Sequence, residues 1–166
     1  MRWIAEAVWL VAAVIAYQTF GPVVEFHRMA PVLPMVLVVR VALAEGAIPG
    51  NLVGFLNGFL LDAFSLDWFG ATMLVDSVIG YSVGAIRNRI VVDNALVRIG
   101  VLFVAAEAHS VGLVLVRSVA SRVGPEPFLV ALGSGAYTAA VGGLWWALIG
   151  LLGAVLGWRS AWHAER

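Results

Sequence analysis

The amino-acid sequence predicts an all-α membrane protein with about six transmembrane helices in a single domain. Hydrophobic residues make up 62% of the 166 residues and charged residues 12%, compared with about 25% charged residues in an average globular chain. Short turns separate the apolar stretches, and most stretches are long enough to cross the bilayer core, which takes roughly 20 residues of helix. The chain length leaves room for one membrane domain and little else.

Six apolar stretches define the expected spans, in order along the chain. The first follows Arg2, and at about twenty residues it is long for the apolar region of a signal peptide, so we interpret it as a retained helix. The sixth is long enough to tilt or break at its glycines. The expected spans are about residues 3–24, 32–44, 50–64, 69–86, 95–116 and 128–157.

The second and third stretches are short for transmembrane helices. Residues 32–44 and 50–64 lie near or below the lower length limit of about 17 residues, and the second carries Arg40. Together they could form a re-entrant pair, which would leave four full spans. We favour six spans because the Pro49-Gly50 turn is tight. Neighbouring helices can also shield short spans from lipid.

The distribution of arginine predicts the orientation of the chain. Cytoplasmic segments of membrane proteins carry an excess of Lys and Arg. With the N-terminus inside, the cytoplasmic segments hold Arg2, Arg87, Arg89, Arg159 and Arg166. The outer segments hold Arg28, Arg117 and Arg122. We therefore expect six spans with both termini in the cytoplasm.

The composition excludes several chemistries. The chain has no cysteine, which removes disulfides, thiol catalysis and iron–sulfur ligation. All ten basic residues are arginine, which excludes Schiff-base chemistry and a P-loop lysine. The formal net charge is zero, so we expect no strongly basic surface that recruits nucleic acid or anionic lipid. Gly133-Ser134-Gly135 lacks the first glycine of the Gly-x-Ser-Gly motif of a rhomboid-like protease. From these observations together we expect no catalytic residue and no cofactor.

Small residues and aspartates recur every four positions in residues 50–84. Four residues advance a helix by roughly 400°, so each series stays near one face. Glycine on a face lets another helix backbone approach closely, and an aspartate is costly in lipid. We therefore expect this face to pack within the protein or to dock a helix of a partner. The series are Gly50, Gly54, Gly58 and Asp62 before the turn, and Asp76, Gly80 and Gly84 after it.

Further polar residues lie inside or near the ends of the spans. A charge at a helix centre costs roughly 2.5–3.5 kcal/mol on insertion scales. We expect these residues to pair and fix the packing, for example Arg40 with Asp62 or Asp76; a proton or substrate path is the alternative. The set is Arg40, Asp62, Asp76, Arg98, Glu107 and His109.

Glu107 and His109 are the two residues that suggest a metal site. Residues two apart on a helix point about 200° away from each other, so they cannot share one site. The sequence places no third ligand within reach of either. We expect no bound metal.

The run of residues 50–70 resembles the family of the rod shape-determining membrane protein MreD. That family shows a Gly-Phe-x-x-Gly-x-x-x-Asp core, a short polar turn and a Leu-Gly-like pair. Matching residues are Gly54, Phe55, Gly58, Asp62 and Gly70, with Phe69 in place of the common leucine. The second span of the family often opens with Pro-Asp, whereas here Pro34 is followed by Met35.

The resemblance implies a non-enzymatic component of the cell-elongation machinery in the bacterial inner membrane. Such proteins bind MreC, a bitopic scaffold, and connect the MreB filament with the peptidoglycan synthases. The resemblance also implies a six-helix fold similar to the substrate-binding component of energy-coupling vitamin transporters. The alternative function is therefore a small-molecule-binding membrane subunit of a vitamin or metal importer.

Overall fold

A computed structural model describes the middle of the chain in most detail. The described residues are 11–12, 14–15, 17, 19, 32–64, 69–90, 94–119, 133–134, 136–138 and 140–144. Within these ranges the regular secondary structure is helical throughout. The first and sixth expected spans, residues 3–24 and 128–157, lie mostly outside them.

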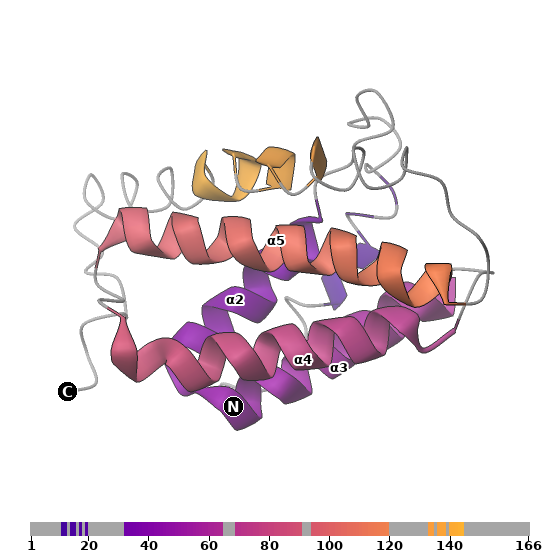
Figure 1. The fold of residues 1–166 in the computed structure, drawn as a ribbon, viewed down its shortest axis with the longest axis horizontal. Coiled ribbons are helices and arrows are strands. Elements are labelled where there is room, and N and C mark those ends of the chain that lie inside the picture. Colours follow the sequence, from indigo (N-terminus) through magenta and orange to yellow (C-terminus); the bar gives the residue numbers. More distant parts are fainter. Residues whose placement is uncertain are drawn as a thin grey trace.

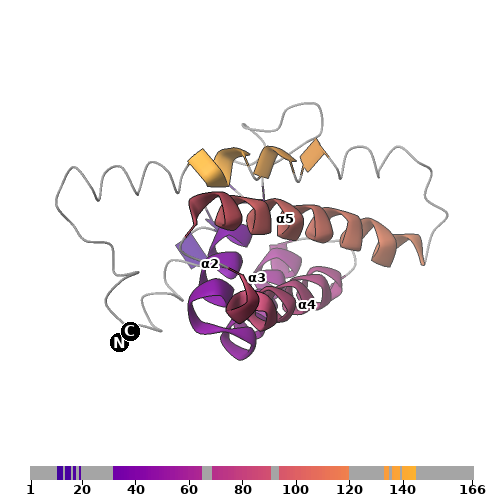
Figure 2. The same cartoon turned by 60° about the vertical axis from the view of Figure 1, so that its left-hand side comes forward.

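Four helices form the described bundle (Figure 1). They are α2 (Leu33–Glu45), α3 (Ala47–Phe64), α4 (Ala71–Ile86) and α5 (Ala95–Ser118), and the short 3-10 helix η1 (Arg87–Arg89) follows α4. Helices α3 and α4 lie side by side and antiparallel, and we call them the α3–α4 hairpin. In both views α2 lies between this hairpin and α5 (Figure 2).

Local signals explain where the helices begin and end. Pro34 stands in the first turn of α2, where a missing N–H costs nothing. The N–H of Val32 donates to the Thr138 hydroxyl at 2.8 Å, and this bond fixes the start of α2 to a residue far along the chain. Gly46 ends α2 with a φ of 104°, a conformation that favours glycine. The side chain of Asn94 caps α5 by accepting from the N–H of Leu96 at 2.9 Å.

Helix α2 forms the centre of the core. Met35, Val38, Val39 and Ala42 are fully buried, because α3, α4 and α5 all contact this helix. Apart from Arg40 and Glu45, every residue of α2 is apolar, as is typical of a buried segment. At 13 residues it is about 20 Å long, which is short of the roughly 30 Å bilayer core.

The observed helices match the four middle predictions except at one turn. The chain breaks at Gly46 and not at the expected Pro49-Gly50 turn, because Gly46 takes the positive φ and proline is tolerated in the first turn of α3. Two helices in the described ranges are long and apolar enough to cross a membrane, residues 47–64 and 96–118. The total number of spans, and the likeness to the vitamin-transporter component, remain predictions.

Candidate functional site

The glycine face of α3 is covered by α4. A Cβ atom built on any of its three glycines would come within 3.0 Å of atoms of α4, closer than real Cβ atoms essentially ever come. The atoms in the way belong to the backbone, so no side chain can move aside. The contacts are Gly50 with Gly80, Gly54 with Asp76, and Gly58 with Thr72 and Met73.

The glycines of α4 make the reciprocal contacts. A Cβ atom on Gly80 would meet the backbone of Gly50, and one on Gly84 would meet the backbone of Gly46 and Ala47. The two helix backbones therefore touch along the whole hairpin, as small residues permit between membrane helices. Of the two uses expected for this face, the geometry corresponds to internal packing, and the face is not open to a partner.

The remaining residues of the family motif have different surroundings. Phe55 points away from α4 and is 44% exposed. Gly70 has a φ of 98° directly before α4, and a Cβ atom there would meet nothing within 4 Å. Its conformation, not crowding, thus favours glycine at this position.

Asp62 closes the turn of the hairpin by capping the neighbouring helix. Its carboxylate accepts from the N–H of Gly70 at 2.9 Å, of Met73 at 3.2 Å and of Thr72 at 3.4 Å. These N–H groups lie at the start of α4, where a helix carries unpaired donors and partial positive charge. The buried charge of Asp62 is therefore stabilised without a basic side chain.

Asp76 joins three helices through a buried network. One carboxylate oxygen accepts from the Asn57 side-chain amide of α3 at 2.7 Å, and the other lies 2.5 Å from Nδ1 of His109 in α5. All three side chains are buried. The partner found for Asp76 is thus a histidine and not Arg40, which we had suggested from the sequence. His109 lies on the face of α5 that packs against α4 and reaches the carboxylate of Asp76. Arg40 is half-buried in α2 and has an interaction of its own.

Asn57 is the member of this network that sequence reasoning missed. The signal was present, since an amide in the middle of an apolar helix needs a hydrogen-bond partner inside the protein. The same holds for Asn51, whose amide donates to the Ser77 carbonyl at 3.2 Å. The Oδ1 atom of Asn57 is buried and has no hydrogen-bond partner, and such an unpaired group costs about 1–3 kcal/mol.

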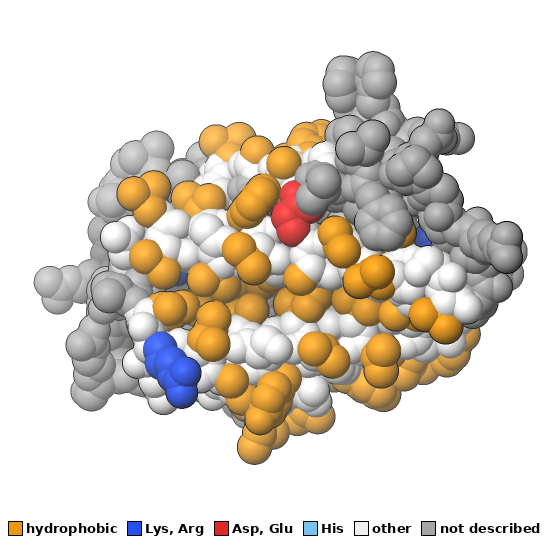
Figure 3. Space-filling view, viewed as in Figure 1, with side chains coloured by type: hydrophobic (Ala, Val, Ile, Leu, Met, Phe, Trp, Pro, Cys, Tyr) orange, Lys and Arg blue, Asp and Glu red, His pale blue; other side chains and the backbone are white. Residues whose placement is uncertain are grey.

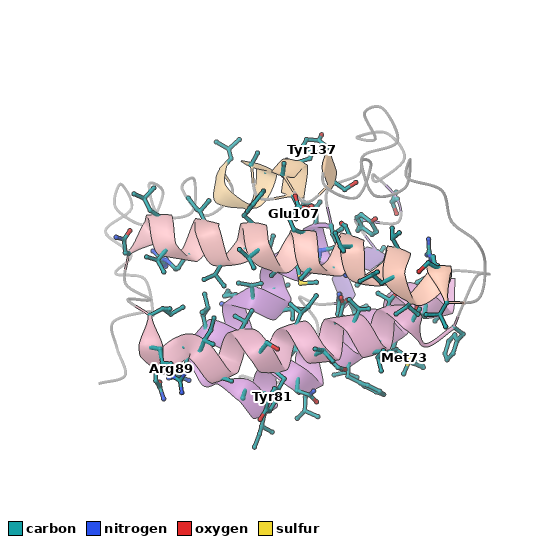
Figure 4. The ribbon with its side chains drawn as sticks, in the orientation of Figure 1. Met73, Tyr81, Arg89, Glu107 and Tyr137 are labelled. Atoms are coloured by element: carbon teal, nitrogen blue, oxygen red, sulfur yellow. The ribbon has the colours of Figure 1, made fainter. Side chains whose placement is uncertain are left out.

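Glu107 lies on the other side of α5 from His109. Figure 4 shows Glu107 on the side that faces Tyr137, while His109 turns toward Asp76 of α4. The two side chains therefore do not meet, in agreement with their spacing. Arg98 is half-buried in the first turn of α5.

Comparison with known proteins places the chain in a family. The family model of the rod shape-determining protein MreD matches residues 1–126. The chain belongs to the MreD family. No curated protein and no solved structure matches. The matched range contains the whole glycine and aspartate series and the three helices that the buried network joins.

Membership in the MreD family indicates what kind of role the motif residues have. MreD proteins are membrane proteins with a role in determining rod shape, and the family is a structural one and not a known enzyme family. The motif residues of this member hold the α3–α4 hairpin together or close its turn, and Phe55 alone points outward. The motif therefore builds a rigid hairpin in this protein.

Proposed function

We propose that this MreD-family protein is a non-enzymatic scaffold of the bacterial rod complex, which binds an MreC-type bitopic protein within the inner membrane. Through that partner it connects to the MreB filament and to the peptidoglycan synthases. Both termini lie in the cytoplasm. The family match supports the role in rod shape.

One observation supports a location for the docking surface. The glycines of the hairpin face each other and are closed to a partner, and we place the docking surface on the outward faces of α3 and α4. These faces carry large exposed apolar side chains, and Figure 3 shows one face of the molecule where almost every coloured side chain is hydrophobic. The exposed residues are Ile48, Leu52, Phe55, Leu56, Phe59 and Phe64 on α3, and Leu74, Val78, Tyr81 and Ile86 on α4.

The α3 face has the shape that a single helix recognises. Ile48, Leu52, Phe55 and Phe59 follow the spacing of a coiled-coil seam, with apolar residues four and then three positions apart. Phe59 also contacts Phe69 edge to face, with ring centroids 6.0 Å apart, so the aromatic end of the seam is held in place. A membrane helix that packs on this seam makes closer van der Waals contacts with it than disordered acyl chains do.

Site-specific photo-crosslinking in cells tests this proposal. A photoreactive residue at Phe55 is expected to crosslink to the MreC-type partner. The matched control is Val104, which is 65% exposed on α5, outside the hairpin. Crosslinking at Val104 and not at Phe55 would refute the proposed surface. If the purified protein instead carried a bound vitamin and co-purified with an ATPase pair, the importer alternative would replace the scaffold.

A further inference from the structure

Two arginines stand where three helix ends meet. Helix α2 ends and α3 begins at Gly46, and α4 leads directly into η1. The close approach of Gly84 to Gly46 brings the end of α4 against this break. Arg87 and Arg89 of η1 are therefore placed beside the α2–α3 break. We call residues 45–48 and 86–89 the arginine corner.

The two arginine side chains are held differently. Nη1 of Arg87 lies 3.4 Å, and its Cδ 3.7 Å, from the position that a Cβ atom on Gly46 would take. Arg87 is thus half-buried and lies across the break between α2 and α3. Arg89 is exposed, and Figure 4 shows it at the end of α4, pointing away from the bundle. One guanidinium is fixed against the protein, and the other reaches outward.

The electrostatics of the arginine corner favour an anion. The negative end of α2 and the positive end of α3 meet at Gly46 and largely cancel, while the negative C-terminal end of α4 lies beside the two arginines that follow it. Glu45 supplies the one acidic side chain of the corner, and it already has an interaction partner. Among the described residues of the corner, two guanidinium groups stand against one carboxylate, so the local side-chain charge is positive although the net charge of the chain is zero. Guanidinium groups bind phosphate in a bidentate fashion.

The surroundings of the arginines identify the source of the phosphate. Ile86 directly precedes Arg87 and is 42% exposed, and Ile48, two residues after Gly46, is 72% exposed. Leu52 continues this apolar surface one turn further along α3. A soluble anion would gain no favourable contact from these exposed apolar side chains. A phospholipid places its phosphate at the membrane interface and its acyl chains against apolar side chains below it.

We propose that Arg87 and Arg89 bind the phosphate of an anionic phospholipid, and that its acyl chains lie along Ile48, Leu52 and Ile86. The site shares Ile48 and Leu52 with one end of the seam proposed for the protein partner, and it differs from that seam in the arginines at the end of α4. It requires that this end of the hairpin lie at a membrane interface, as we expect because α3 is long and apolar enough to cross a membrane.

Lipid retention by the purified full-length protein tests the proposal. The protein in mild detergent is given equal amounts of phosphatidylglycerol and phosphatidylcholine, and native mass spectrometry counts the bound lipids. We expect roughly fivefold or greater preference for phosphatidylglycerol. The double variant Arg87→Gln/Arg89→Gln is expected to lose this preference. The matched control Arg117→Gln, in the last turn of α5, is expected to keep it.

Several results would overturn the proposal. Equal retention of the two lipids by the wild-type protein would do so, and so would an unchanged preference in the double variant. Displacement of phosphatidylglycerol by excess inorganic phosphate would assign the arginines to a free anion. If the double variant fails to fold by circular dichroism, Arg89→Gln alone replaces it, because that side chain is exposed. An unchanged preference in that variant would equally contradict the proposal.

Discussion

Replacing Gly54 by alanine probes the backbone contact of the α3–α4 hairpin. The added Cβ would meet the carbonyl of Asp76. Because both groups belong to helix backbones, the helices must separate. Overpacking of this kind costs about 1–3 kcal/mol. Against it stands the gain of about 0.5–1 kcal/mol that alanine brings inside a helix.

The separation also affects the buried network. Asn57, one turn after Gly54, donates to Asp76 at 2.7 Å, and a hydrogen bond to a charged group is worth about 1.5–3 kcal/mol. Loss of part of this bond brings the expected net destabilisation to about 2 kcal/mol. For a chain of this length, that corresponds to a drop in Tm of roughly 4–8 °C.

Thermal unfolding of the purified protein, followed by circular dichroism, measures the effect. The matched control is Gly100→Ala in α5, where an added Cβ would meet nothing within 4 Å. We expect this control to be neutral or slightly stabilising, since it brings the helix gain without a clash. Equal Tm values for the two variants would refute the close-contact reasoning. A larger drop in Tm for Gly100→Ala than for Gly54→Ala would also contradict this reasoning.

Three further predictions use the same unfolding measurement. Asp62→Asn is expected to be milder than Asp62→Leu, because asparagine can still cap α4, and the leucine variant should lose about 1–2 kcal/mol; equal losses would show that charge, not hydrogen bonding, matters. His109→Leu should cost about 1–3 kcal/mol by leaving one carboxylate oxygen of Asp76 unpaired, while Asn57 still donates to the other. Adding Asp76→Leu should restore part of this loss, and a further loss in the double variant would contradict the prediction. Asn94→Ala should cost about 1 kcal/mol by removing the cap of α5, and an unchanged Tm would speak against that cap.

The sequence predicted the hairpin well because its signals are periodic. The four-residue spacing of Gly50, Gly54 and Gly58 fixes one face of a helix, and the helix bounds followed from the apolar runs and the polar turn. The position of the break between α2 and α3 was wrong. Proline suggested a turn at Pro49, but a first helical turn accepts proline and the positive φ falls on Gly46.

The partners of the buried polar residues could not be derived from the sequence. Spacing shows which residues share a helix face, but not which helix lies opposite. His109 is 33 residues from Asp76 along the chain, and only the packing of α5 on α4 brings them together. Similarly, Asp62 takes its partners from backbone N–H groups, which carry no signal in the sequence.

The direct contact between the backbones of α3 and α4 has a mechanical consequence. Side chains between helices can change rotamer and so absorb small movements, but two touching backbones leave no such layer. The hairpin therefore moves as one rigid body. Among the described helices, α2 and α5 pack on the hairpin, and we expect a movement imposed by a neighbour in the membrane to shift them against it, across the Asp76–His109 contact between α4 and α5.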